Sequence, residues 1–157
     1  MNDPVGNEAS APPDVAPPTV RRLMSPAPPS IDQFETVMAA ARRMRASGAV
    51  SIPVSDECAL FLGMLSDRDI VERCVADGQD PRVTRVGALV QSCEQTVTAD
   101  HPADSTVLSM VLRQPLGQLP VVENGVLVGV ITLAGIASLL IDDRDPDGAA
   151  SRLFWPT

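Results

Sequence analysis

A repeated pattern of apolar runs, punctuated by proline and glycine, constrains this sequence more than any other feature. The stretch IPV…FLGMLSDRDI at residues 52–70 returns as LPVV…LVGVITLAGI at residues 119–136, so that Gly63 corresponds to Gly129. A repeat made of such short elements indicates two copies of one supersecondary unit. Each copy needs the other to cover its apolar face.

The first copy reads as alternating helices and strands. Helical spacing of apolar residues predicts a helix that Gly48 ends, because glycine readily adopts the left-handed conformation found after a helix C-terminus. Two β runs follow at Val50–Val54 and Leu60–Leu65, and then a helix that Gly78 ends. The apolar positions are Val37, Ala40, Ala41 and Met44 in the first helix and Ile70, Val71, Cys74 and Val75 in the second.

The second copy follows the same order. Its predicted elements are a helix over Val107–Val111, strands at about 118–122 and 126–131, and a helix over about 133–141. Pro115 stops the first of these helices, and Asn124-Gly125 is a strong signal for a tight hairpin between the strands. With a short leading strand at 96–98, the unit is β-α-β-β-α. The predicted fold class is therefore α/β, with two such repeats related by a pseudo-twofold axis.

Composition suggests the domain boundaries. Residues 1–19 contain five prolines and few apolar side chains, which predicts a disordered arm because little surface can be buried there. The first repeat is expected at 20–80, the second at 81–141, and a polar tail at 142–157. Leu153–Trp155 lies in this tail, and we expect that apolar cluster to dock on this chain or on a partner.

Composition also excludes several classes of protein. All 12 basic residues are arginine, so a lysine base, a Schiff base and a P-loop are ruled out. The net charge of −8 argues against nucleic acid and anionic membranes as partners. A single histidine cannot form a histidine metal site alone, and no apolar run is long enough to span a membrane. Three cysteines without C-x-x-C spacing predict free thiols in a cytoplasmic protein. No catalytic constellation fits the sequence, so we expect no enzyme, no metal and no cofactor.

The closing motifs GMLSDRDI and GVITLAGI, with the proline strand and the hairpin before each of them, resemble the cystathionine-β-synthase (CBS) domain family. The two copies together resemble a CBS pair, or Bateman module, over residues 20–141. This resemblance implies a regulatory or sensor module without catalysis, often a homodimer. In many members of the family an adenine nucleotide binds between the repeats.

The stretch Ser66-Asp67-Arg68-Asp69 has two interpretations. As a capping box, Ser66 begins a helix and Asp69 bonds back to its N–H, while Arg68 pairs with Glu72 on the surface. As a ligand site, the carboxylate accepts ribose hydroxyls, the helix N-terminus suits a phosphate, and Arg68 meets phosphate oxygens. In nucleotide-binding members of the CBS family, the Ser/Thr and the Asp of this motif take these roles. The resemblance therefore supports Ser66, Arg68 and Asp69 as nucleotide-binding residues.

The second copy departs from the motif, because Thr132 keeps the hydroxyl but Gly135 replaces the acid. One good site is therefore expected, and a second, weaker site comprises Thr132 with Ser51, Ile52 and Pro53. In the family, the motif of one repeat faces the leading strand and the proline strand of the other. The resemblance thus implies a facing set of Val97, Thr98, Gln118, Leu119 and Pro120. In that set Leu119 and Pro120 would clasp the adenine, and Gln118 would reach a polar edge. The same residues also fit ordinary positions in a sheet.

Two functions from different classes stay open. One is a module that senses an adenine nucleotide such as AMP, ADP or ATP, or S-adenosylmethionine. The other is a ligand-free protein-interaction module with a CBS fold, in which the motif is only a helix cap. The effector would be a separate protein that the sequence does not identify. A homodimer is expected through helix faces that carry small or branched residues, namely Ala39, Ala40, Ala41, Val107 and Val111.

Overall fold

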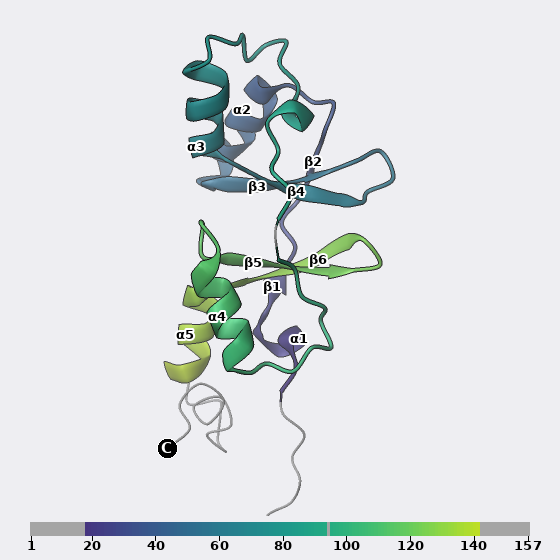
Figure 1. The fold of residues 1–157 in the computed structure, drawn as a ribbon, viewed down its shortest axis with the longest axis vertical. Coiled ribbons are helices and arrows are strands. Elements are labelled where there is room, and N and C mark those ends of the chain that lie inside the picture. Colours follow the sequence, from purple (N-terminus) through teal and green to yellow (C-terminus); the bar gives the residue numbers. More distant parts are fainter. Residues whose placement is uncertain (1–17, 94, 142–157) are drawn as a thin grey trace, which may run out of the picture.

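The computed structural model describes residues 18–93 and 95–141. Two halves stack along the long axis of the molecule (Figure 1), and each contains a three-stranded sheet with helices on its outer side. The two sheets face each other across the middle, and we call the halves upper and lower as Figure 1 draws them. The predicted arm up to residue 17 and the tail at 142–157, with its Leu153–Trp155 cluster, lie outside the described residues.

The upper half extends from residue 31 to residue 91. Its strands are β2 (Ile31–Asp32), β3 (Ser51–Ser55) and β4 (Phe61–Ser66), in the order β2-β3-β4, with β2 parallel and β4 antiparallel to β3. Its helices are α2 (Val37–Ser47), α3 (Asp67–Ile70) with a π-helical turn (Val71–Val75), and a 3-10 turn (Val86–Ala88). Thr36 caps α2 by accepting a hydrogen bond from the N–H of Ala39 (3.2 Å). Gly48 ends it at a φ of 69°, as predicted.

The lower half repeats this arrangement with one addition. It contains α4 (Ser105–Arg113), β5 (Gln118–Glu123), β6 (Val126–Thr132) and α5 (Leu133–Ile141), preceded in the chain by α1 (Val20–Leu23) and β1 (Ser25–Pro26). The sheet order is β1-β6-β5, and every pair is antiparallel. The predicted leading strand at 96–98 is reduced to one parallel bridge between Val97 and Val121. That bridge stands where β2 stands beside β3 in the upper half. The two β-α-β-β-α repeats and the α/β class are confirmed.

Each half has its own apolar core. The upper core draws on residues from Ile31 to Leu89, whereas the lower core combines Val20 and Leu23 with residues from Val97 to Ile136. From Pro18 onward the chain therefore begins in the lower half, builds the upper half and returns. The last residues of the stretch assigned to the arm belong to the lower half, since the carbonyl of Pro18 accepts a hydrogen bond from the N–H of Ala103 (2.8 Å).

Three of the five residues expected to form a dimer face belong to these cores instead. Ala40, Val107 and Val111 have no exposed surface and pack inside their own halves. They lie on the inner sides of α2 and α4, where their helical spacing directs all three side chains into the core of their own half. Ala39 and Ala41 are half-buried.

The inner face of each sheet meets the other half. Because side chains alternate along a strand, Ile52 and Val54 enter the upper core while Ser51 and Pro53 face the lower sheet. Strand β5 alternates in the same way. The Ser51 hydroxyl donates a hydrogen bond to Oε1 of Gln118 (3.0 Å), which joins the first residues of β3 and β5.

Two segments cross from one half to the other, and each pairs antiparallel with a strand of the sheet that it passes. The segment after Leu23 forms β1 and pairs with β6. The segment after Leu89 pairs with β4 through a bridge between Gln91 and Met64. These two crossing segments occupy equivalent places in the two repeats.

A glycine lies under each crossing segment. A methyl group on Gly63 would lie 2.1 Å from the carbonyl oxygen of Gln91, and one on Gly129 would lie 2.8 Å from the carbonyl oxygen of Ser25. No side chain fits at either place unless the backbone moves. Close approach of backbone to backbone therefore requires glycine at the two positions that the repeat shares.

We predict that Gly63→Ala destabilises the fold much more than Gly117→Ala. Both glycines have positive φ, at 155° and 61°, but a methyl group on Gly117 would meet nothing within 4 Å. The strained φ at Gly117 should cost roughly 1–2 kcal/mol. The added clash at Gly63 should bring the loss there above about 3 kcal/mol. Urea denaturation measures both, and equal losses would show that close approach does not dictate glycine at position 63.

Candidate functional site

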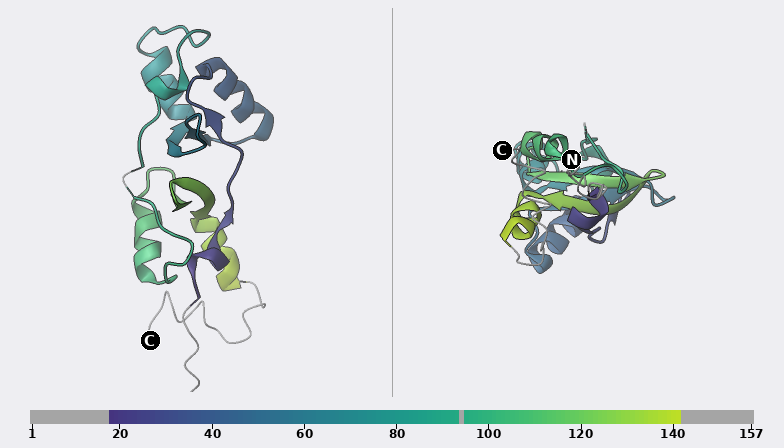
Figure 2. Two further views of the ribbon diagram at one scale, coloured as in Figure 1. Left: turned by 90° about the vertical axis from the view of Figure 1, so that its right-hand side faces the viewer. Right: turned by 90° about the horizontal axis from the view of Figure 1, so that it is seen from below.

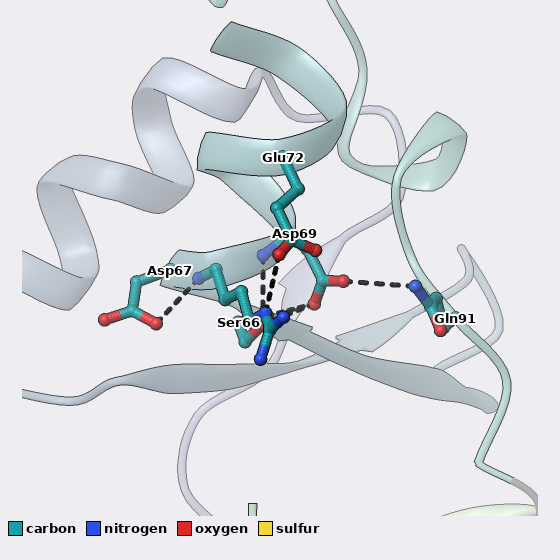
Figure 3. A network of polar contacts seen from close by, with 6 residues as sticks. Ser66, Asp67, Asp69, Glu72 and Gln91 are labelled. Carbon is teal, nitrogen blue, oxygen red and sulfur yellow. Dashed lines mark hydrogen bonds and ion pairs between the residues drawn. The ribbon is translucent and has the colours of Figure 1, made fainter. Parts of the chain in front are cut away.

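The Ser66–Asp69 motif lies where β4 ends and α3 begins. Figure 3 shows Asp69 between Ser66 at the strand end and Gln91 on the second crossing segment. The location follows from the local sequence, because the extended backbone of Ser66 (φ −100°, ψ 162°) is that of an N-cap residue.

Asp69 and Ser66 form a complete capping box. Oδ2 of Asp69 accepts hydrogen bonds from the N–H (2.9 Å) and the hydroxyl (2.5 Å) of Ser66, and the Ser66 Oγ accepts one from the N–H of Asp69 (3.1 Å). Ser66 is only 6% exposed. The capping interpretation of the motif is confirmed, and two of these bonds, both to Oδ2, fix the direction of the carboxylate.

The remaining N–H groups of this first turn also have acceptors. The N–H of Asp67 donates to the carbonyl of Val50 (2.9 Å), and the N–H of Arg68 donates to Oδ1 of Asp67 (2.7 Å). An incoming anion therefore meets no free N–H at this turn. The group here that can meet a phosphate is the guanidinium of Arg68.

Arg68 is positioned by a surface ion pair. Its Nε lies 2.7 Å from Oε1 of Glu72, with side chains 79% and 55% exposed. The hydrogen bond to Glu72, reinforced by its charge, raises the pKa of Arg68 above its usual range. An arginine guanidinium is in any case charged at physiological pH. An ion pair this exposed contributes little free energy, so Arg68 can exchange Glu72 for another anion at low cost.

Gln91 completes the surroundings of Asp69, and the sequence analysis did not identify it. Its Nε2 donates a hydrogen bond to Oδ1 of Asp69 (3.2 Å) (Figure 3). No motif contains Gln91, and it reaches Asp69 only because the second crossing segment lies against β4. Nothing in the local sequence could have indicated this contact.

The structure divides the predicted facing residues into two groups. Val97 and Leu119 are 5% and 0% exposed and belong to the lower core, so they have only backbone to offer a ligand. Pro120 is buried on the inner face of β5, and Thr98 is exposed. Gln118 is connected to the motif, because it bonds to Ser51, which pairs with Ser66 across β3 and β4.

The weaker site is built differently. The Oγ1 of Thr132 accepts a hydrogen bond from the N–H of Gly135 (3.0 Å), so the cap survives without a carboxylate to return the bond. A methyl group on Gly135 would lie 3.3 Å from Thr132 Oγ1 and 3.7 Å from the carbonyl of Leu23. Of the residues predicted opposite, Ile52 enters the upper core and Pro53 is buried between the sheets.

Comparison with known proteins identifies the fold. Two segments of the chain, 20–76 and 86–142, match the CBS domain. The chain belongs to the CBS domain family. The first matched segment begins with α1 and β1, which belong to the lower half. The core and the sheet of the lower half are therefore built from residues of both CBS domains.

Several relatives share this CBS pair. Hypoxic response protein 1 of Mycobacterium tuberculosis is 31% identical over 119 residues, which cover 76% of this chain and 82% of that protein. YhcV of Bacillus subtilis is 29% identical over 135 residues, covering 86% of this chain and 92% of that protein.

Solved structures agree. That of Hypoxic Response Protein I, with two coordinated zinc ions, has a TM-score of 0.67, and the match covers 76% of this chain and 96% of that chain. CBSX2 in complex with AMP shares the fold at 20% identity with a TM-score of 0.67, over 79% of this chain and 96% of that chain.

Other features of the CBS pair lie away from the motif. A surface depression of about 380 Å³ runs along α4 in the lower half, and the Oε1 of Gln95, which lines it, is buried without a hydrogen-bond partner. Among the described residues, no group of three or more His, Cys, Asp and Glu could hold a metal, and no helix could cross a bilayer.

Cys58, Cys74 and Cys93, all within the described ranges, are unpaired. Burial raises the pKa of the Cys93 thiol despite a hydrogen bond from Met64.

We predict that Ser66→Ala costs more stability than Thr132→Ala. Ser66 gives and receives hydrogen bonds in its capping box, whereas Thr132 only accepts one. Loss of a cap costs about 0.5–2 kcal/mol, so Ser66→Ala should lie at the upper end and Thr132→Ala at the lower. Urea denaturation of the two variants measures this, and a larger loss for Thr132→Ala would contradict the assignment.

Proposed function

We propose that this CBS pair is a regulatory module that binds an adenine nucleotide such as AMP, ADP or ATP, with the ribose on Asp69. The observation that carries the proposal is the orientation of the Asp69 carboxylate. Its Oδ2 is held by Ser66, so its Oδ1 turns toward the second crossing segment, where Gln91 is its partner. A charged acceptor of fixed direction suits a ribose hydroxyl.

Neighbouring groups support the same ligand. Arg68 lies one residue from Asp69 and is free to leave Glu72, so it supplies a cation for a phosphate. Gln118 supplies an amide on the inner face of β5, where an adenine edge would need donors and acceptors. S-Adenosylmethionine presents the same ribose and adenine without a phosphate, and comparing it with AMP separates the contribution of Arg68.

The complex of CBSX2 with AMP lends support from the family, because it concerns the same fold. The departure of the second copy from the motif favours one nucleotide per chain, since Gly135 offers no acceptor. Catalysis is not part of this proposal, and the effector would be a separate protein.

A second function is favoured by one specific observation. The Ser66 hydroxyl and both oxygens of the Asp69 carboxylate already have hydrogen-bond partners within the chain, as a purely structural helix cap requires. On this alternative the protein is a ligand-free interaction module with a CBS fold.

Asp69→Ala decides between the two functions. We expect the wild-type protein to bind AMP in isothermal titration calorimetry and Asp69→Ala to lose that binding, at a cost to folding of about 0.5–2 kcal/mol. The matched control is Asp104→Ala, which removes a capping carboxylate from α4 in the lower half. It should lose similar stability and keep AMP binding. Absence of binding to the wild type at millimolar AMP, or unchanged binding by Asp69→Ala, would leave the interaction module as the function.

Gly135→Asp tests the asymmetry between the copies. A carboxylate at this position would complete the capping box of Thr132 and supply the missing ribose acceptor. We expect the stoichiometry of AMP binding to rise from one toward two per chain in calorimetry. A stoichiometry that stays at one in the folded variant would show that the second copy lacks more than its acid.

We also propose that the module is a homodimer, through a different surface from the one expected from sequence. Both views place α3 and α4 on the same side of the molecule (Figures 1 and 2). Three apolar side chains of these helices are largely exposed: Val71 (59%) and Val75 (62%) in the π-helical turn that continues α3, and Leu112 (61%) in α4. Apolar groups shared by neighbouring helices are typical of an interface between identical chains.

Light scattering tests this dimer. The wild type should scatter with twice the chain mass at micromolar concentration, and Val75→Asp should shift it toward one chain mass. Val83→Asp, at another largely exposed valine (71%) in a turn of the upper half, is the matched control and should leave the mass unchanged. A wild type of one chain mass would contradict the proposal.

A further inference from the structure

The hydrogen bonds at Asp69 leave little room for a ribose. A carboxylate offers four acceptor positions, two on each oxygen. Ser66 fills both positions on Oδ2, with its N–H and its hydroxyl. Gln91 fills one position on Oδ1. One position therefore remains, whereas the two neighbouring hydroxyls of a ribose need two.

Gln91 is held in a way that suits a movable group. Its backbone is pinned on β4, through the bridge to Met64 and the close contact over Gly63. Its side chain is exposed and reaches Asp69 with a single hydrogen bond of 3.2 Å. Rotation of this side chain would release the second position on Oδ1 without moving the backbone.

We propose that the amide of Gln91 is a gate on Asp69 that competes with the second ribose hydroxyl. The proposal rests on the ribose site proposed above. When both hydroxyls of a ribonucleotide bind, the amide must leave Oδ1; a ligand with one hydroxyl uses the remaining position and leaves the amide in place. Gln91 thus weakens the binding of ribonucleotides relative to deoxyribonucleotides.

Two features of the structure favour competition over a positioning role. Two hydrogen bonds from Ser66 to Oδ2 already fix the Asp69 carboxylate, so Gln91 is not needed to orient it. The position equivalent to Gln91 in the other repeat is Ser25, which pairs with β6 as Gln91 pairs with β4. In that repeat Gly135 stands at the position of Asp69. The glutamine is therefore found in the repeat that has the carboxylate.

The experiment compares AMP with 2′-deoxy-AMP on wild type and Gln91→Ala. We expect Gln91→Ala to bind AMP about three- to tenfold more tightly than wild type, as the loss of one competing hydrogen bond allows. Its affinity for 2′-deoxy-AMP should stay within about twofold, because that ligand never needed the second position. Gln91→Asn, whose shorter amide cannot reach Oδ1, should behave as Gln91→Ala does. Gln79→Ala removes another exposed glutamine of the upper half and should change neither affinity.

The outcomes separate the gate from the ribose site. If Asp69→Ala loses AMP while Gln91→Ala binds AMP no better than wild type, the ribose site stands and the gate is wrong. An equal gain for both nucleotides would make Gln91 a steric obstacle and overturn the gate on Oδ1. Absence of AMP binding by the wild type would overturn the proposed function and, with it, the gate.

Discussion

The close approach of two crossing segments to two strand glycines is the contact on which the rest of this structure depends. Because Gly63 and Gly129 have no side chain, each segment lies directly on the sheet that it crosses. The first of these contacts holds the segment that follows α1, whose side chains complete the lower core. The second contact brings Gln91 to Asp69. Backbone packing against these two glycines therefore determines which groups surround the candidate ligand site.

Asp69 serves the fold and the site with different oxygens. Oδ2 closes the capping box and stabilises the start of α3, while Oδ1 faces the crossing segment. This division explains why one motif supports two interpretations without contradiction. It also means that stability and binding are coupled at Asp69, so a carboxylate elsewhere that only caps a helix, such as Asp104, is the proper reference for it.

Much of the fold was predictable because the deciding signals are local. Helical spacing, the left-handed glycine after α2 and the Asn-Gly turn between β5 and β6 fixed the repeated elements within a residue or two. The sequence also shows the alternation of inward and outward residues along each strand. That alternation would have placed the side chains of Val97 and Leu119 in the core. The contact between Gln91 and Asp69 and the place of α1 in the lower half were not predictable, since both depend on how distant segments cross. The π-helical turn after α3 also carries no local signal that we can identify.

The helix α1 precedes the upper half in sequence but packs in the lower half, and this affects how the chain folds on the ribosome. Domains generally acquire structure as they emerge, beginning with the N-terminal one. Here the upper half is continuous in sequence and can form once residue 91 is available. Val20 and Leu23, although synthesised earlier, have no core to enter until Ile136 has been made. The helix α1 is thus among the last of the described elements to be buried, and its side chains stay accessible to chaperones until the lower half has been made.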